Sequence, residues 1–241
     1  MKPKDRLILA LDVADRAEAL SLVELLRAEV GIFKVGWQLF MAAGPNILLD
    51  LGRNFIDSRI FLDLKIYDIL NTLKGALRSI VPGVALVTIH SDLQAGGLTD
   101  ILKEIDGGFK VLAVTLLTNL SGKDLRNLGY APEYTDDPAR LVLLRARSAQ
   151  AAGCDGVICS GREARAVKEA CGPDFLVVCP GIRPAWTVVA GDDQRRVVTP
   201  YEALRNGADY IVVGRPIRTA PDPVAAARQV VEEMAAGLAA R

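Results

Sequence analysis

Eight short apolar runs recur along the chain, and stretches with helical spacing separate them. The runs are Leu7–Leu11, Phe33–Trp37, Ile60–Lys65, Leu86–His90, Val111–Leu117, Gly156–Ser160, Phe175–Cys179 and Tyr210–Gly214. Most are apolar throughout rather than alternating, which is typical of strands covered on both faces in a parallel sheet or barrel. The pattern therefore predicts eight buried parallel strands.

The stretches between the runs predict helices. In the first of them, apolar residues recur at i, i+3, i+4 and i+7 and so share one stripe of a helix: Ala19, Leu22, Val23 and Leu26. A later helix is predicted to begin at Asp137-Pro138, an N-cap followed by proline, and to stop before Gly153. A short extra helix is expected after Ser121. Strands and helices thus alternate at the length of a βα unit.

Eight such units in 241 residues, without a Ser/Gly linker, predict an α/β protein with one domain over residues 1–241. The expected fold is a (β/α)₈ TIM barrel. A doubly wound open sheet stays possible, because a count of strands does not show closure. Two connections, over residues 118–137 and 180–200, are longer than the rest. In a barrel both would lie on the carboxyl face of the strands, where active sites of this fold are built.

Composition excludes several classes of protein. Lys+Arg and Asp+Glu each number 29, and 51% of the residues are hydrophobic, which argues against a disordered chain or a basic nucleic-acid binder. No run approaches the roughly 18 apolar residues of a membrane helix, and the start does not resemble a signal peptide, so a cytoplasmic location is expected. Metal-binding spacing is absent from the four cysteines, which are expected to be reduced packing residues: Cys154, Cys159, Cys171 and Cys179.

Charged residues cluster at the predicted strand ends. Because side chains on a strand alternate, Asp63 and Lys65 should share one side of their strand, while Leu62 and Leu64 face the helices. Asp12 would end the first strand and Lys34 would lie on the second. The spacing suggests an alternating ring of Lys34, Asp63, Lys65 and Asp68. A self-satisfying charge network is the alternative, but buried ions are costly, so this cluster favours catalysis.

The neighbours of Lys65 indicate what it does. Asp63 and Asp68 favour its ammonium form, so we expect a cation and proton donor rather than a Schiff-base amine. A Ser-His-Asp triad is disfavoured, because the single histidine, His90, has no obvious serine partner and is expected to serve packing or hydrogen bonding.

A second constellation follows the last two predicted strands. Gly214-Arg215 comes after the eighth strand and Pro180–Arg183 after the seventh. The loops at these places form the usual phosphate site of a TIM barrel, where glycine lets backbone amides approach and arginine supplies a forked donor. Gln194, in the long loop, could close over the same anion.

These segments together resemble the orotidine 5'-phosphate decarboxylase family, over nearly the whole chain. The matching segments are Leu9–Asp12, Phe33–Gly36, Asp63-x-Lys65-x-x-Asp68, Pro180–Arg183, Asp193-Gln194 with Arg196, and Gly214–Ile217. The resemblance implies that the chain converts orotidine 5'-phosphate to uridine 5'-phosphate in pyrimidine synthesis, with no cofactor and no metal.

The resemblance also implies a role for each matching residue. Lys65 would protonate C6 of the pyrimidine, between Asp63 and Asp68, which would flank the departing carboxylate. Lys34 and Asp12 would contact the ribose, and Thr118 the pyrimidine. The phosphate would be held by the matching residues near the last strands: Arg183, Gln194, Gly214 and Arg215. Asp68, Ile69 and Thr72 would come from a second subunit, which implies a homodimer.

The chain departs from most bacterial relatives at Ile66, Tyr67 and Leu70, where the family has Phe, His and Pro, and at Asn119, where it has Ser. Two rival functions stay open. One is a Mg²⁺-dependent decarboxylase or synthase acting on a ketose phosphate, and the other is an inactive nucleotide-phosphate-binding protein. The role of Trp186, in the long loop, is undecided between ligand contact and packing, with packing favoured.

Overall fold

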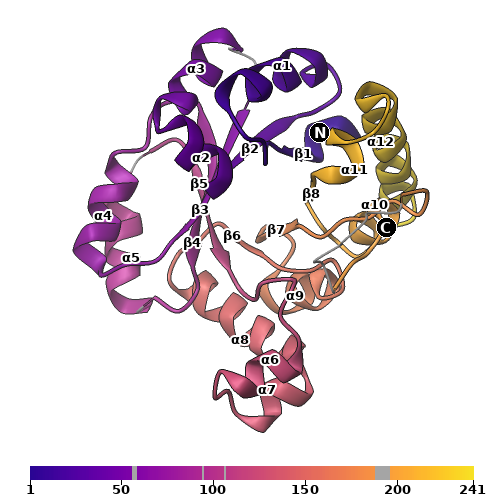
Figure 1. The fold of residues 1–241 in the computed structure, drawn as a ribbon. Helices are drawn as coiled ribbons and strands as arrows, with labels where there is room; N and C mark the ends of the chain where they lie inside the picture. Colours follow the sequence, from indigo (N-terminus) through magenta and orange to yellow (C-terminus); the bar gives the residue numbers. More distant parts are fainter. Residues whose placement is uncertain (56–58, 94, 106, 188–195) are drawn as a thin grey trace.

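A computed structural model describes residues 1–241 except 56–58, 94, 106 and 188–195. Parallel strands follow one another around a closed barrel, and β8 pairs with β1 to close it (Figure 1). The strands are β1 (Leu7–Ala10), β2 (Ile32–Gly36), β3 (Arg59–Ile66), β4 (Val84–His90), β5 (Lys110–Val114), β6 (Gly156–Ile158), β7 (Leu176–Cys179) and β8 (Tyr210–Val213). The predicted TIM barrel is confirmed, and the open sheet is excluded.

Helices form an outer ring around the strands (Figure 1). They are η1 (Pro3–Arg6, a 3₁₀ helix), α1 (Arg16–Leu26), α2 (Trp37–Ala43), α3 (Asn46–Asn54), α4 (Leu70–Arg78), α5 (Ala95–Glu104), α6 (Gly122–Asn127), α7 (Pro132–Asp136), α8 (Pro138–Ala151), α9 (Ala164–Cys171), α10 (Pro200–Arg205), α11 (Arg215–Arg218) and α12 (Pro223–Ala239). The long connection after β5 contains α6 and α7, which protrude from the ring (Figure 1). The extra helix expected after Ser121 is therefore confirmed.

Local sequence explains where these helices begin and end. The Asp137 carboxylate accepts a hydrogen bond from the backbone N–H of Ala139 at 3.2 Å, and Pro138 occupies the first turn of α8. Gly153, just beyond α8, has φ of 91°, a conformation that glycine adopts without steric cost. Ser121 caps α6 together with Asp124. Each of these features satisfies backbone groups that a helix end leaves unpaired.

The core has two layers, one on each side of the strands. On β1, Leu7 and Leu9 pack in the layer shared with the helices, whereas Ile8 and Ala10 fill the barrel interior. Phe61 of β3 packs in the interior layer as well. Burial of each such leucine or isoleucine contributes about 1.5–3 kcal/mol. Because both faces are covered, the strands read as uninterrupted apolar runs.

All four cysteines are free and buried, as predicted. Burial raises the pKa of the Cys154 thiol to about 12, with a smaller contribution from the charge of Asp155. Burial raises the pKa of Cys171 as well. These thiols therefore carry little thiolate at neutral pH. No helix in the described part of the chain is sufficiently long and apolar to span a bilayer.

Candidate active site

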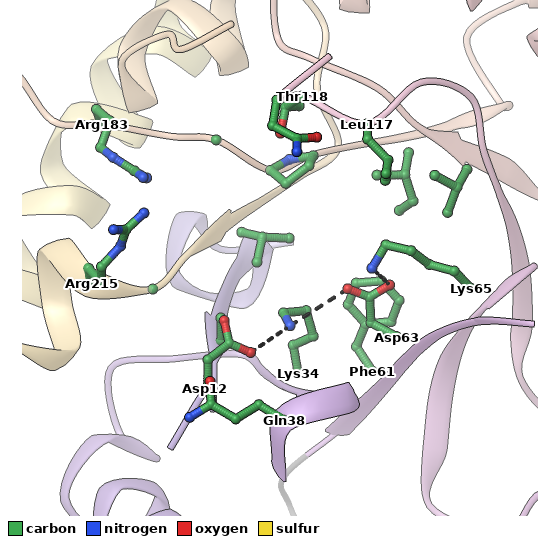
Figure 2. Close-up of a pocket in the computed structure, with 18 of the residues that line it drawn as sticks. Asp12, Lys34, Gln38, Phe61, Asp63, Lys65, Leu117, Thr118, Arg183 and Arg215 are labelled. Atoms are coloured by element: carbon green, nitrogen blue, oxygen red, sulfur yellow. Dashed lines mark hydrogen bonds and ion pairs between the residues drawn. The ribbon is translucent and has the colours of Figure 1, made fainter. Parts of the chain in front are cut away.

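A cavity of about 630 Å³ opens at the carboxyl ends of the strands (Figure 2). Its size suits a small organic ligand. Eight of the residues predicted from the sequence line it: Asp12, Lys34, Asp63, Lys65, Thr118, Arg183, Gly214 and Arg215. They come from the ends of β1, β2, β3 and β8 and from the segments that follow β5 and β7. The barrel thus brings together side chains as far apart in the sequence as Asp12 and Arg215.

Charges alternate along one wall of the cavity. The Nζ atom of Lys34 lies 3.1 Å from Oδ1 of Asp12 and 3.6 Å from Oδ2 of Asp63. The Nζ atom of Lys65 donates to Oδ1 of Asp63 at 2.9 Å. Lys34 is only 9% exposed, so its ammonium depends on these carboxylates rather than on water. We call Asp12, Lys34, Asp63 and Lys65 the charged row.

Asp63 is the central carboxylate of the charged row. Burial alone would raise its pKa, but the charges of Lys34 and Lys65, with hydrogen bonds from Lys65 and Thr88, outweigh burial and lower it. Asp63 is therefore ionised at neutral pH, and a fixed negative charge lies 2.9 Å from the amine of Lys65. The row presents one cation, Lys65, at its open end.

Lys65 lies at an irregularity of β3 that simple alternation does not predict. From Leu62 to Ile66 the register advances four residues along β3, but only two along β4, from Val87 to Ile89. Lys65 has φ of 50°. Within the described part of the chain, no other non-glycine residue has a positive φ. Such strain is tolerated where the surroundings enforce it, and it concentrates at functional sites. Leu62 and Leu64 face the helical layer, as predicted.

Thr88 of β4 enforces this conformation. Its hydroxyl oxygen accepts a hydrogen bond from the backbone N–H of Lys65 at 2.9 Å and donates to Oδ1 of Asp63 at 3.0 Å. Thr88 is fully buried. One hydroxyl thus holds the backbone of the lysine and the side chain of its partner carboxylate. Sequence analysis missed Thr88, although a threonine inside the apolar run Leu86–His90 was a usable signal.

Gly36 leaves room for the charged row at the end of β2. A Cβ atom on this residue would lie 2.8 Å from Nζ of Lys34 and 3.4 Å from Oδ1 of Asp12. The first distance is shorter than a van der Waals contact allows. A side chain in place of Gly36 would therefore displace the Lys34 ammonium from its position beside Asp12.

Comparison with known proteins agrees with this arrangement. The model of the orotidine 5'-phosphate decarboxylase / HUMPS family matches residues 5–230. The chain belongs to this family. A relative from Desulfosudis oleivorans named orotidine 5'-phosphate decarboxylase is 45% identical, with 96% of this chain and 94% of the relative covered. One of the same name from Anaeromyxobacter dehalogenans is 46% identical, with 99% and 100% covered.

A solved structure shows the same fold. The crystal structure of orotidine 5'-phosphate decarboxylase from Lactobacillus acidophilus matches with a TM-score of 0.79 and 34% identity, covering 95% of this chain and 98% of that one. A second crystal structure, of an uncharacterised conserved protein from Geobacillus kaustophilus, matches with a TM-score of 0.76 and 29% identity, covering 95% and 99%.

The opposite end of the cavity from Lys65 carries arginines. The guanidinium groups of Arg183 and Arg215 point toward each other there (Figure 2). The segment after β7 that carries Arg183 is held by backbone pairing, since the Arg183 N–H donates to the carbonyl of Val198 at 3.0 Å. Gln194, predicted to close over this end, lies outside the described residues.

A buried ion pair fixes the end of the long connection after β7, just beyond the undescribed residues 188–195. Nη2 of Arg196 donates to Oε2 of Glu163 at 3.0 Å, and the Arg196 carbonyl accepts from the hydroxyl of Ser160 at 2.8 Å. Burial raises the pKa of Glu163, although the charge of Arg196 opposes the shift. In this family member, the two ends of the long connection therefore pair with each other, and the Arg196 end is also anchored to the segment after β6.

Arg145 of α8 supports the loop that carries Thr118. It is buried, and Nη1 donates to the carbonyl of Thr115 at 2.6 Å, while Nη2 donates to Asp92 at 2.7 Å and to the hydroxyl of Tyr130 at 2.9 Å. Three segments beyond β4, β5 and α6 meet at this guanidinium. Sequence analysis missed it, because an arginine in an amphipathic helix normally indicates a solvated face.

Three predicted site residues lie elsewhere. Asp68, Ile69 and Thr72 are exposed and do not line the cavity of the charged row. An Asp68 carboxylate oxygen accepts from the backbone N–H of Ile69 at 2.7 Å, just before α4. The ring suggested by spacing thus contains Asp12 instead of Asp68 within one chain.

His90 and Trp186 make structural contacts. The His90 ring lies 4.9 Å from that of Tyr67, and burial lowers the pKa of His90, with Arg145 contributing and Asp92 opposing. Nε1 of Trp186 donates to Glu233 at 2.8 Å, and Trp186 does not line the cavity. The expectation of packing roles for both residues agrees with these contacts.

Some residues that line the cavity were not predicted as site residues. They are, among others, Gln38, Leu117, Asn119 and Arg218. Leu117 ends a predicted strand, and the others lie within about one turn after one, which was the available signal. Among the residues that the structure describes, no group of three or more histidine, cysteine or acidic side chains is arranged to hold a metal ion.

Proposed function

We propose that this chain decarboxylates orotidine 5'-phosphate to uridine 5'-phosphate in pyrimidine synthesis, without a cofactor. The observation that carries the proposal is a single cavity with the charged row at one end and Arg183 and Arg215 at the other. A nucleotide has a reacting base at one end and a phosphate at the other. The family to which the chain belongs supports this reading.

Lys65 is the proton donor of the proposed reaction. The bond between C6 of the pyrimidine and the carboxylate carbon breaks, carbon dioxide leaves, and the electron pair stays on C6. The Nζ atom of Lys65 then gives a proton to C6. Its positive charge, fixed in place by Asp63 at 2.9 Å, stabilises the developing carbanion before the proton moves.

The other members of the charged row orient Lys65 and the sugar. Lys34 neutralises Asp63 and Asp12. In the proposed reaction, Lys34 and Asp12 also bind the ribose hydroxyl groups. Thr118 contacts the pyrimidine. Arg183, Gln194, Arg215 and the backbone of Gly214 hold the phosphate, whose remote binding energy contributes to turnover as well as to affinity.

Asp68, Ile69 and Thr72 complete the site of a second copy in the proposed homodimer. They are exposed in the single chain, next to an apolar surface on which Trp37 is 52% exposed and Tyr67 is 63% exposed. Apolar surface of this kind marks a protein contact. In the dimer, Asp68 would join the charged row from the partner. The cytoplasmic location expected from the sequence stays a prediction.

A Mg²⁺-dependent reaction on a ketose phosphate is less compatible with the charged row. A cation between Asp12 and Asp63 would have to displace the ammonium of Lys34, which lies 3.1 Å from the first and 3.6 Å from the second. The chain's own lysine supplies the positive charge that a metal would bring. The relatives described above that carry an enzyme name are decarboxylases of orotidine 5'-phosphate.

The test is loss of the ultraviolet absorbance of orotidine 5'-phosphate with purified protein in excess EDTA. Lys65→Ala should lower kcat by about 10⁴-fold or more, because it removes both a general acid and a preorganised charge. Lys103→Ala, an exposed lysine of α5, is the matched control and should retain full activity. An unchanged ultraviolet melting curve would show that the fold survives.

Each of the two rival functions predicts a different result in this assay. Turnover that EDTA abolishes would favour the metal-dependent enzyme. Tight binding of uridine 5'-phosphate without consumption of orotidine 5'-phosphate would favour the inactive binder. Full activity of Lys65→Ala would remove Lys65 from the mechanism.

A further inference from the structure

A third arginine lines the arginine end of the cavity. Arg218 ends α11, three positions after Arg215, so the two side chains lie on the same side of this short helix. Arg183, Arg215 and Arg218 all line the one cavity. Sequence analysis gave no role to Arg218, since the motif that points to phosphate, Gly214-Arg215, ends before it.

The bonding of Arg218 differs from that of the cavity's lysines. Lys34 and Lys65 are each paired with a carboxylate of the charged row. Arg218 forms no ion pair with any residue that the structure describes, and its Nε atom is buried without a hydrogen-bond partner. A buried donor left unpaired costs stability. Arg218 thus lines the cavity as a cation that has no carboxylate partner among the described residues.

The charges of the cavity indicate what kind of ligand that is. Among the described lining residues, carboxylates occur only at Asp12 and Asp63, and both are engaged by lysines of the charged row. At the opposite end, the guanidinium groups of Arg183 and Arg215 converge (Figure 2), and Arg218 lines the same cavity. Like charges repel, and a guanidinium binds a phosphate through paired N–H donors. A phosphate ester, which carries close to two negative charges at neutral pH, fits three of them.

We propose that Arg218 is a third phosphate-binding arginine, which makes this cavity select nucleoside 5'-phosphates over nucleosides. The proposal deepens the proposed function, on which it rests for the orientation of the nucleotide. Binding of the phosphate gives an acceptor to the guanidinium groups that line the cavity and neutralises the cluster. Arg218 therefore acts on the phosphate and has no part in the proton transfer at Lys65.

The test compares binding of uridine 5'-phosphate and of uridine by titration calorimetry, at one fixed ionic strength. The variants are Arg218→Gln, Arg218→Lys and the matched control Arg205→Gln, which makes the same charge change at an exposed residue at the end of α10. Loss of a hydrogen bond to a charged group should weaken the binding of uridine 5'-phosphate about tenfold or more in Arg218→Gln. The affinity of Arg218→Lys for uridine 5'-phosphate should lie between those of the wild type and Arg218→Gln, because lysine keeps the charge but lacks the forked guanidinium.

Three results decide the matter. Uridine affinity should stay within about twofold in every variant, and so should uridine 5'-phosphate affinity in Arg205→Gln, because screening weakens distant charges. Equal loss for nucleotide and nucleoside, or equal loss in Arg205→Gln and Arg218→Gln, would overturn the proposal. The two proposals can fail separately. If the wild-type protein consumes no orotidine 5'-phosphate, the proposed decarboxylation is refuted. If the Arg218→Gln variant then still loses the preference for uridine 5'-phosphate over uridine, the role of Arg218 is supported.

Discussion

Replacing Lys34 by methionine tests whether the charged row is held together as the geometry indicates. The substitution keeps the length of the side chain but removes the cation between Asp12 and Asp63. Lys34 is 9% exposed, and the Asp63 side chain is 13% exposed, so water replaces little of the lost interaction. Breaking a buried pair costs about 3–5 kcal/mol. The Asp12 side chain is 43% exposed and is better solvated, which places the expected loss near 3 kcal/mol.

The loss should depend on pH, with a sign fixed by Asp63. In the wild type its pKa is lowered, so its contribution to stability is present above about pH 4 and is lost only below, as the pH falls through the folded pKa. Without Lys34, burial dominates and the pKa of Asp63 rises. The buried charge then destabilises the variant at high pH, and protonation relieves it as the pH falls. The difference in stability should therefore shrink from pH 8 to pH 5.

Urea unfolding, followed by circular dichroism at pH 5, 6, 7 and 8, measures this difference. Lys110→Met is the control. The Lys110 side chain, which pairs with Asp155, is 59% exposed, so this ion pair should contribute at most about 1 kcal/mol. A Lys34→Met loss no larger than that of Lys110→Met would show that Lys34 does not hold the charged row together. So would a loss that stays constant over this pH range.

Three further predictions concern the rest of the molecule. Arg215→Ala should lower kcat/KM for orotidine 5'-phosphate by about 10²-fold through lost phosphate binding, and steady-state kinetics with an unchanged kcat/KM would contradict it. Arg145→Met should lower the free energy of unfolding by about 3 kcal/mol in urea, since it leaves Asp92 and the Thr115 carbonyl without their donor; a loss under about 1 kcal/mol would count against this network. Ellman's reagent should label the thiols only after unfolding, because Cys154 has a pKa of about 12 and all four are buried, so rapid labelling of the native protein would disprove their inert state.

The fold could be predicted because it is written in local patterns. Each apolar run corresponds to a strand. Parallel strands that are covered on both faces are apolar at nearly every position, so they stand out from the amphipathic helices between them. The order of strands and helices then left few topologies. The residues that line the cavity were also predictable, because a TIM barrel gathers whatever follows its strands at one face.

The parts that escaped prediction depend on contacts between distant segments. Alternation correctly predicted that Asp63 and Lys65 share one side, but it did not predict the shift in register of β3 against β4, because register is set by pairing rather than by local sequence. Thr88 and Arg145 act on residues 23 and 30 positions away, so no local pattern announces them. Asp68 matches the family motif, yet it lies away from the cavity in a single chain.

The hydroxyl of Thr88 has a consequence for attempts to graft this chemistry onto another barrel. Transplanting an Asp-x-Lys tripeptide alone would reproduce the letters but leave the lysine on a regular strand, with its amine aimed differently. The donor and recipient would have to share the threonine on the adjoining strand and the two surplus residues that make the kink. The smallest portable unit is therefore a pair of neighbouring strands, and designers should exchange β3 and β4 together.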